Sequence, residues 1–402
     1  MNSKSVSDYP LVILALLLSA YGIAIVYSAG QTDFPVPYIV HAWERQLGWF
    51  ALSLLSAYLV FRASVRLVEW MTVPLYWIGI GLLVVTLIFG SGAGTAASVK
   101  GWLTIGGVRI GQPAEMAKVT VVLMLARVLA SRKEAPKSLL ELWKPAAVVG
   151  LPWLLIMAQP DLGTGIVFIG IFFALLYWSG VSWQLLALIS SPAVSLILVA
   201  LVLYYRPYIV EGVVLVLANV AMGVIAPLLW ERLAPYQQRR LLVFLDPSAD
   251  PRASGYHVIQ SQVAIGSGGW FGKGYTLGTQ KRLAFLPAQH TDFIFSVVGE
   301  ELGFIGVTLA LALFLLLFMR VVRVASRAND SFGSLVAFGL GASWFVHVVV
   351  NVGMTLNLMP ITGIPLPFFS YGGSFMLASW LAIGILLRIS SEGRGRADTL
   401  AV

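Results

Sequence analysis

The stretch that decides the fold is FIFSVVGEELGFIGVTLALALFLLLFM, residues 293–319. A membrane-spanning helix needs roughly 20 predominantly apolar residues, and this run exceeds that length. A bilayer offers backbone groups no hydrogen-bonding partner, and the run lacks the period-two alternation of a barrel strand. It therefore predicts a helix that crosses a membrane.

Apolar runs of the same kind recur on both sides of this stretch. They cover residues 10–29, 46–62, 71–90, 114–131, 145–158, 163–179, 183–205, 209–230, 332–352 and 371–388. We predict an all-α polytopic membrane protein with about ten transmembrane helices. It forms a single integral membrane domain over 1–402, with a large outer loop at 231–291 between helices 7 and 8. The run at 209–230 is extra, and we favour one crossing plus a re-entrant or interface segment over 183–230.

Basic residues gather in short clusters between alternate apolar runs, and the positive-inside rule places such clusters in the cytoplasm. The clusters are Arg62 and Arg66; Arg127, Arg132, Lys133, Lys137 and Lys144; Arg320, Arg323 and Arg327; and Arg388, Arg394 and Arg396. The alternate loops then face outward, at 30–45, 91–113, 159–163, 231–291 and 353–370. These outer loops contain most of the prolines, many of the glycines and most of the unusual polar residues.

Composition excludes several classes of protein. Of 402 residues, 58% are hydrophobic and only 11% are charged, which excludes an ordinary soluble domain and a disordered chain. The net charge of +8 is confined to short clusters, so it does not indicate a nucleic-acid partner. Cysteine is absent and the four histidines are scattered, so no thiolate or histidine metal site is evident. A divalent cation, Mg²⁺ or Mn²⁺, held by substrate phosphates would leave little trace in the sequence.

Asp292 immediately precedes the apolar run of 293–319. A carboxylate in the first turn of a membrane helix has two interpretations. It can simply favour the helix dipole. Alternatively, partial burial can raise its pKa toward neutrality, as a general base requires. The residue alone leaves both interpretations open.

Other ionisable residues lie within or beside the apolar runs, where a charge is costly unless it is paired. Glu300 and Glu301 need a polar interior or a cation. Glu115 and Lys118 are three residues apart, and we favour an ion pair between them inside the bundle. Asp161 in QPDLGTG either caps the following helix or lines a polar cavity.

Two outer stretches carry further candidate residues. SVKGWLTIGGVRIGQPAEMAK (98–118) places Lys100, Trp102 and Arg109 outside, although a tryptophan at an interface is often only an anchor. NLMPITGIPLPFFSYGGSFMLASW (357–380) has three prolines before Ser370 and Tyr371. Such broken segments hold substrates in transporters, but they also occur as simple kinked entrances to helices.

Five blocks together resemble the SEDS family (shape, elongation, division and sporulation) over roughly residues 10–390. They are GQPAEMAK (111–118), QPDLGTG (159–165), GYHVIQSQVAIGSGG (255–269), FLPAQHTDFIFSVVGEELGFIG (285–306) and PLPFFSYGGS (365–374). Block 255–269 and the segment NVGMTLNLMP resemble the rod-shape elongation branch, RodA, more than the division branch, FtsW.

The resemblance implies a ten-helix inner-membrane peptidoglycan glycosyltransferase with extracytoplasmic active loops. It would polymerise lipid II, the undecaprenyl-pyrophosphate disaccharide-pentapeptide, beside a class B penicillin-binding protein and membrane lipid. Asp292 matches the proposed catalytic acid of the family, and Trp102 matches an important outer tryptophan. The other expected substrate-binding residues are Lys100, Arg109, Glu115, Lys118, Asp161, Arg239, Arg240, Gln260, Ser261, His290, Ser370 and Tyr371.

Three positions depart from the family pattern. Ala114 replaces a serine, Gly101 replaces an arginine next to Trp102, and Ala288 replaces an acid. Two other functions remain open: a transporter that flips the lipid-linked precursor, and a scaffold that only recruits a transpeptidase. A transporter needs a site near the midplane with access from both faces. Here the unusual residues lie in the outer loops, which favours an enzyme that acts at the outer face. The resemblance implies that this enzyme inverts the anomeric centre, which one displacement with an Asp292 base would achieve.

Overall fold

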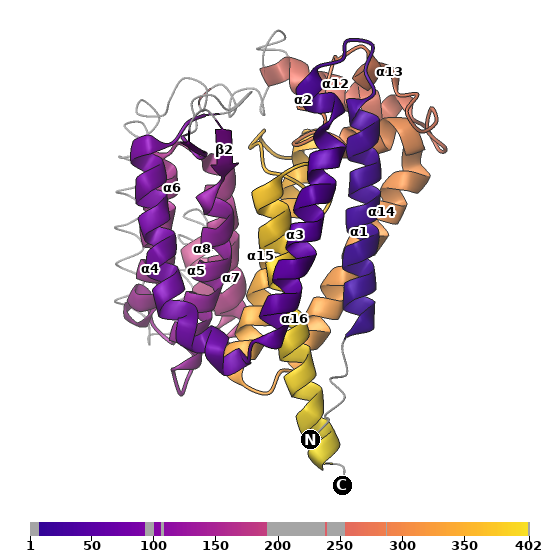
Figure 1. Ribbon diagram of the computed structural model, residues 1–402. Helices are drawn as coiled ribbons and strands as arrows, with labels where there is room; N and C mark the ends of the chain where they lie inside the picture. Colours follow the sequence, from indigo (N-terminus) through magenta and orange to yellow (C-terminus); the bar gives the residue numbers. More distant parts are fainter. Residues whose placement is uncertain are drawn as a thin grey trace.

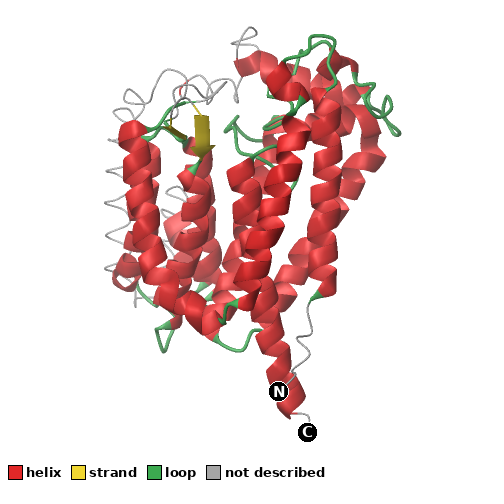
Figure 2. Cartoon of the chain, viewed as in Figure 1, coloured by secondary structure: helices red, strands yellow, loops and turns green. Residues whose placement is uncertain are grey.

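The computed structural model describes residues 8–92, 100–105, 108–190, 238, 254–286 and 288–400, and within these ranges the fold is a bundle of long helices (Figures 1 and 2). Helices α1 (Tyr9–Gly30), α3 (Ala42–Arg62) and α4 (Val65–Phe89) come first, with the short α2 (Pro37–Val40) between α1 and α3. The next group is α5 (Pro113–Ala130), the 3₁₀ turn η1 (Leu139–Leu142), α6 (Trp143–Ala158), α7 (Leu162–Trp178) and α8 (Trp183–Ser190). The last group is α12 (Ser254–Ser267), α13 (Thr279–Arg282), α14 (Ile294–Ser326), α15 (Ser331–Thr355) and α16 (Gly373–Leu400).

Six helical segments in the described residues are long and apolar enough to cross a membrane. They are Tyr9–Gly30, Val65–Phe89, Leu139–Ala158, Ile294–Ser326, Ser331–Thr355 and Gly373–Gly393. The chain is therefore a multi-pass membrane protein. The expected segment at 209–230 and most of 183–205 lie outside the described residues, so the count of ten helices stays a prediction.

Short polar side chains begin several of the helices. At the start of four helices, the side chain of the N-cap residue accepts a hydrogen bond from a backbone N–H of the first turn. These residues are Asp8 for α1, Ser64 for α4, Asp161 for α7 and Asp330 for α15. Each bond satisfies one of the amide groups that a helix leaves unpaired at its start. Asp161 therefore caps a helix, as one of its two interpretations predicted.

Helix α15 lies in the interior of the bundle, where it packs against α5, α7 and α14 (Figure 1). Small residues bring other segments close together. A Cβ on Gly384 of α16 would lie 2.5 Å from the Ala57 carbonyl oxygen of α3. A Cβ on Gly22 of α1 would lie 2.4 Å from the Phe369 Cα. Such close packing is characteristic of membrane helices, which gain little hydrophobic energy from associating.

A small antiparallel hairpin interrupts the otherwise helical structure. Strand β1 (Leu103–Ile105) pairs with β2 (Val108–Gly111), and Ser91 bridges to Trp102. The sequence predicted an outer loop here and no strand. The hairpin lets this loop satisfy its own backbone groups at the end of the bundle.

Helix α14 is broken at Gly303, which has φ 59° and ψ −156°. The single span predicted for 293–319 is therefore two helical pieces, and the second runs on to Ser326. The loop at 268–274 forms hydrogen bonds with the backbone groups that the break leaves unpaired. The amides of Phe304 and Ile305 donate to the carbonyls of Gly269 and Trp270 at 2.9 and 3.2 Å. In return, the amides of Lys273 and Gly274 donate to the helix carbonyls of Glu300 and Glu301 at 3.0 Å each. Non-helical backbone at membrane depth requires such internal partners.

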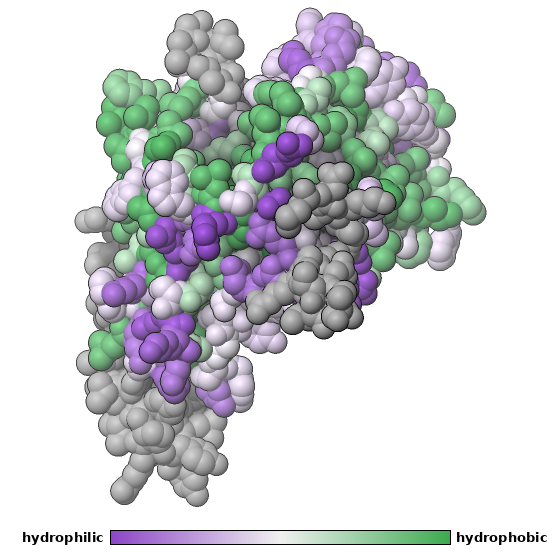
Figure 3. Space-filling model, turned by 60° about the horizontal axis from the view of Figure 1, so that its bottom comes forward, coloured by the Kyte–Doolittle hydropathy of each residue, from purple (hydrophilic) through white to green (hydrophobic). Residues whose placement is uncertain are grey.

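The two ends of the bundle differ in character. The hairpin, α2, α12 and α13 gather at one end, while the chain termini lie at the other (Figure 1). The loop at 131–142, with Arg132, Lys133 and Lys137, lies at the end with the termini. Figure 3 views that end and shows hydrophilic residues gathered there, with hydrophobic residues along the sides. The division agrees with the loops that the charge pattern separated.

Candidate functional site

Asp292 lies in the turn Ala288–Phe293, at the end of the bundle opposite the termini. Helix α14 begins at Ile294, its N-cap is Phe293, and the cap has no side-chain hydrogen bond. The expectation that Asp292 lies in the first helical turn is therefore wrong. It precedes the helix, because the turn at 288–293 delays helix formation. Its side chain is intermediate in burial, so water and protein both reach it.

Three hydrogen bonds join the backbone of this turn to α15 and to the proline-rich loop 357–372. The Asn351 amide donates to the Asp292 carbonyl at 2.9 Å. The Ser370 hydroxyl donates to the Thr291 carbonyl at 2.6 Å. The Tyr371 backbone amide donates to the His290 carbonyl at 2.9 Å. The predicted residues His290, Asp292, Ser370 and Tyr371 thus form one cluster, although some 80 residues separate the two segments.

An arginine lies beside this cluster that sequence reasoning missed. Arg45 of α3 donates through Nε to the Tyr371 hydroxyl at 3.1 Å and through a terminal nitrogen to the Tyr38 carbonyl. Its guanidinium lies 4.2 Å from the centre of the Tyr38 ring, a cation–π contact. The neighbouring Gln46 donates to the Ser370 carbonyl at 3.1 Å and so fixes α3 to the same loop. The signal for Arg45 was its position at the outer start of the apolar run 46–62.

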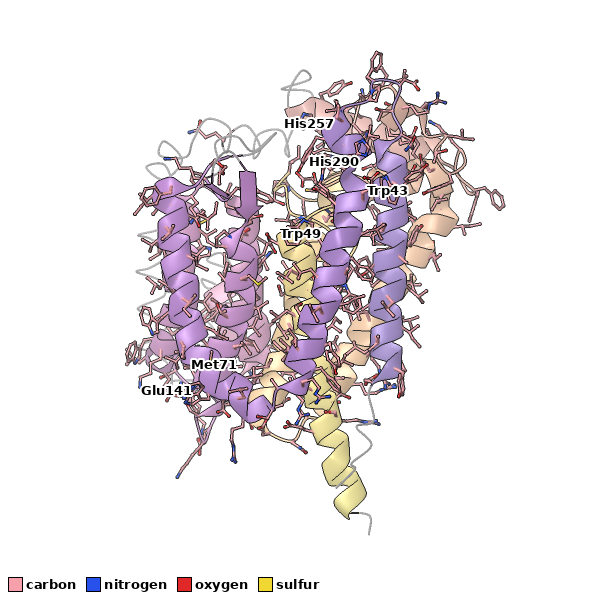
Figure 4. The ribbon with its side chains drawn as sticks, in the orientation of Figure 1. Trp43, Trp49, Met71, Glu141, His257 and His290 are labelled. Atoms are coloured by element: carbon pink, nitrogen blue, oxygen red, sulfur yellow. The ribbon has the colours of Figure 1, made fainter. Side chains whose placement is uncertain are left out.

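His290 packs among the aromatic rings of this cluster (Figure 4). Its ring centre lies 5.6 Å from Tyr371 and 6.3 Å from Tyr38. Burial, with a further contribution from the positive charge of Arg45, lowers the pKa of His290 to about 4. The imidazole is therefore neutral near pH 7. Its Nδ1 is buried and has no hydrogen-bond partner among the residues that the structure describes.

Glu115 and Lys118 form the predicted ion pair inside the bundle, with 2.7 Å between Oε2 and Nζ and side chains 3% and 4% exposed. The same ammonium lies 2.7 Å from His347 Nε2 on α15. His347 Nδ1 lies 2.9 Å from the Pro365 carbonyl, which can only accept. The imidazole therefore donates from Nδ1, and its Nε2 accepts from Lys118. Through His347, the buried group of Glu115, Lys118 and His347 contacts the Pro365 carbonyl of the loop 357–372. The same loop contacts the turn of Asp292 through Ser370.

Asp161 and Gln112 connect two more of the quoted blocks to this region. The Gln112 amide nitrogen Nε2 lies 3.5 Å from Asp161 Oδ2. Its backbone amide donates to the Ser374 hydroxyl at 3.0 Å. Blocks 111–118, 159–165 and 365–374 therefore meet in space, which their separation in the sequence did not reveal.

Glu300 and Glu301 have the cations that the sequence required. Lys273 pairs with Glu300 at 2.8 Å, and Lys281 pairs with Glu301 at 2.6 Å. Lys281 is fully buried, although it belongs to the segment 231–291 that the sequence predicted to be a large outer loop. Burial lowers the pKa of Lys281, although the adjacent Glu301 opposes that shift.

The other residues that the sequence predicted for the site lie on α12, in or beside the hairpin, or outside the described residues. Ser261 on α12 is buried and hydrogen-bonds to the Ser296 hydroxyl and the Thr355 carbonyl, so it joins α12 to two neighbouring helices. Gln260, the residue before it, is partly buried. Trp102 is partly buried in the hairpin, and Lys100 is exposed. The Arg109 backbone lies in β2, but its side chain is outside the described part of the chain. Arg239 and Arg240 lie outside the described residues altogether.

A metal centre of protein ligands is not found in the described ranges. Among them, no group of three or more His, Asp or Glu side chains is placed to hold an ion. The divalent cation, Mg²⁺ or Mn²⁺, that the sequence left open has no preformed cage in this part of the chain.

Fold and site together define a multi-pass membrane protein with a polar and aromatic site at one end of its helices. The chain belongs to the FtsW/RodA/SpoVE family of cell cycle proteins, whose model matches residues 9–395.

Two relatives and two solved structures illustrate the similarity. The peptidoglycan glycosyltransferase MrdB of Escherichia coli (strain K12) is 38% identical over 96% of this chain and 94% of its own length. The peptidoglycan glycosyltransferase RodA of Treponema pallidum (strain Nichols) is 34% identical over 98% of this chain and 100% of its own. A chain in a structure described as a peptidoglycan synthase complex that coordinates polymerization and crosslinking aligns with TM-score 0.73 and 29% identity, covering 96% and 98% of the two chains. The crystal structure of Thermus thermophilus RodA aligns with TM-score 0.64 and 27% identity, covering 96% and 97%.

Proposed function

We propose that this chain, a peptidoglycan glycosyltransferase of the FtsW/RodA/SpoVE family, uses Asp292 as the general base that joins lipid II units into glycan strands during cell elongation. The observation that carries this proposal is the anchoring of the Asp292 turn. Hydrogen bonds from Asn351, Ser370 and Tyr371 hold three successive carbonyls of one turn. A catalytic carboxylate needs such a rigid support, because small displacements of a base lower its efficiency steeply.

The chemistry requires one base and a group that stabilises negative charge. A sugar 4-hydroxyl attacks an anomeric carbon, its proton passes to the Asp292 carboxylate, and the bond to the lipid pyrophosphate breaks. One displacement inverts the anomeric centre, so no second carboxylate is needed as a nucleophile. A cation should stabilise the charge that develops on the leaving pyrophosphate.

The structure favours a cation that the sequence did not suggest. The sequence suggested Lys118 among others, but Lys118 is buried and already paired with Glu115. Arg45 is the better candidate, because its guanidinium lies in the same cluster as His290 and Tyr371. We propose that Arg45 binds the pyrophosphate, while Tyr38 and Tyr371 offer flat surfaces to the sugars.

Location and partner follow the same reasoning. The site lies at the end of the bundle away from the basic clusters, which supports an extracytoplasmic active site in the inner membrane. The similarity to a chain of a complex that polymerises and crosslinks supports a class B penicillin-binding protein as partner. The apolar sides of the helices would face membrane lipid and the polyprenyl tail.

The test is lipid II polymerisation by the purified chain together with its cognate transpeptidase. We expect polymer from the wild type and at least a hundredfold less from Asp292→Asn, which keeps the shape of the side chain and removes the base. The matched control is Asp33→Asn, which makes the same change in an outer-loop carboxylate that pairs with Arg282 at 2.8 Å. It should polymerise at a rate close to the wild type.

Three results would overturn the assignment. Wild-type rates from Asp292→Asn would exclude the base. Movement of fluorescent lipid II across vesicle membranes, with no polymer from the wild type, would favour the transporter. Normal cell shape in cells that carry Asp292→Ala would favour the scaffold.

A further inference from the structure

Asn351 of α15 makes two hydrogen bonds that join separate parts of the site. Its side chain is fully buried, and its Nδ2 lies 2.9 Å from the Asp292 carbonyl oxygen and 2.8 Å from the Ile364 carbonyl oxygen. Both neighbours can only accept, so the amide must direct its NH₂ group toward them. One side chain therefore supplies a donor to the turn that carries Asp292 and a donor to the loop 357–372.

His347 extends this support by one helical turn. It lies four residues before Asn351, hence on the same face of α15. Its Nδ1 donates to the Pro365 carbonyl at 2.9 Å. Two successive carbonyls of the loop, at Ile364 and Pro365, are thus held by two side chains of one helix.

The loop needs these donors for a reason visible in its sequence. Pro360, Pro365 and Pro367 have no amide hydrogen, so regular backbone pairing is not available to this segment. Its carbonyls must find side-chain donors when buried. Ser370 at the end of the loop then donates to the Thr291 carbonyl at 2.6 Å, which returns the chain of contacts to the catalytic turn.

We propose that Asn351 is a positioning residue for Asp292. It fixes the backbone of the base to the proline-rich loop, and thereby fixes the carboxylate relative to Arg45, His290 and Tyr371. This inference rests on the proposed role of Asp292 as the base. Within the described part of the chain, the hydrogen bonds of Asn351 go to backbone carbonyls, so its effect reaches the substrate through Asp292.

The experiment measures kcat and KM for lipid II with Asn351→Leu, which has similar volume and no donors. We expect kcat to fall at least tenfold while KM stays within about threefold, because substrate contacts remain. The matched control is Asn329→Leu, since Asn329 donates to the Glu392 carbonyl at 2.7 Å at the opposite end of the bundle. That variant should keep the wild-type kcat.

A second variant covers the case in which Asn351→Leu does not fold. Asn351→Ser retains one donor, and we expect it to fold with a kcat between those of the wild type and Asn351→Leu. Rates are expressed per folded molecule, with folding followed by Tm and gel filtration in detergent.

The outcomes separate this inference from the proposed function. If Asp292→Asn is inactive but both Asn351 variants keep the wild-type kcat per folded molecule, the positioning role is wrong and the base assignment stands. A rise in KM with an unchanged kcat would also overturn the positioning role, because it would indicate a binding contact. If Asp292→Asn polymerises normally, the base assignment fails and the positioning role fails with it.

Discussion

Lys281 and Glu301 form a salt bridge that is removed from solvent, with both side chains 0% exposed. All three ammonium hydrogens have acceptors, because Lys281 Nζ also lies 2.6 Å from the carbonyl and the hydroxyl of Ser28. The three residues belong to α1, α13 and α14. A fully satisfied buried pair is tolerated, whereas one partner left alone is strongly destabilising.

Removing one member of this pair should therefore destabilise the protein. We expect Lys281→Met or Glu301→Gln to lower the free energy of unfolding by about 3–5 kcal/mol. The double variant Lys281→Met/Glu301→Gln should lose less than the sum of the two single variants, since no uncompensated charge remains. Unfolding in detergent, analysed as a double-mutant cycle, measures this coupling. Strict additivity would contradict it.

His290 makes stability depend on pH. Its pKa falls from 6.5 to about 4 on folding, so between these values the unfolded chain binds more protons than the folded chain. Stability should consequently decrease as the pH falls from about 6.5 to about 4, by up to about 3 kcal/mol. The Tm of the wild type and of His290→Gln, measured from pH 7.5 to 4.5, tests this. The difference between the two should shrink or reverse at low pH, and a constant difference would contradict the assignment.

At the scale of elements, the break in α14 is the place where the loop 268–274 bonds to that helix. Gly303 adopts a conformation that other residues rarely adopt, and a Cβ there would lie 2.4 Å from the Gly272 amide nitrogen. The loop 268–274 pairs with the broken helix on both sides of Gly303. The piece before the break, which follows Asp292, is thus held by a loop rather than by a continuous helix.

Gly303→Ala should disturb this junction. Backbone strain and the steric clash together predict a loss of at least about 2 kcal/mol in unfolding free energy. Gly266→Ala on α12 is the matched control, because nothing lies within 4 Å of its added Cβ. That variant should be neutral or gain about 0.4–1 kcal/mol. Thermal unfolding in detergent compares the two, and equal Tm values would show that the break bears no strain.

At the scale of the whole molecule, the two ends of the bundle carry different groups. Its basic loops and termini lie at one end, and the Asp292 cluster lies at the other (Figures 1 and 4). The buried Glu115, Lys118 and His347 group lies between them and touches the loop beneath the site. The arrangement suits a lipid-linked substrate whose head reacts at one membrane surface.

Sidedness can be tested directly because the chain contains no cysteine. A single cysteine at Phe34, which is 65% exposed in the loop before α2, should react with a membrane-impermeant maleimide in intact spheroplasts. A cysteine at Lys133, exposed in the loop after α5, should react only after permeabilisation. The reverse pattern would invert the topology and exclude an extracytoplasmic site.

Much of the fold was predictable from local composition. Long apolar runs gave the spans, because every residue of a lipid-facing helix has to be compatible with hydrocarbon. The ion pair of Glu115 with Lys118 followed from helical spacing, and the cap formed by Asp161 was one of two interpretations that its position left open. Asp292, His290, Ser370 and Tyr371 were named as site residues from their blocks.

The contacts that organise the site were not predictable in this way. Four of the contacting residues, Arg45, Gln46, His347 and Asn351, lie on helices far along the chain from Asp292, and nothing in their local sequence indicates that they meet it. Likewise, Lys281 in a glycine-rich loop gave no sign of its burial against α1 and α14. Sequence alone located the six described helical segments that are long and apolar enough to cross a membrane, because hydrophobicity is a property of each segment. Only the tertiary structure decided which polar groups meet at Asp292, because those contacts depend on how separate helices pack.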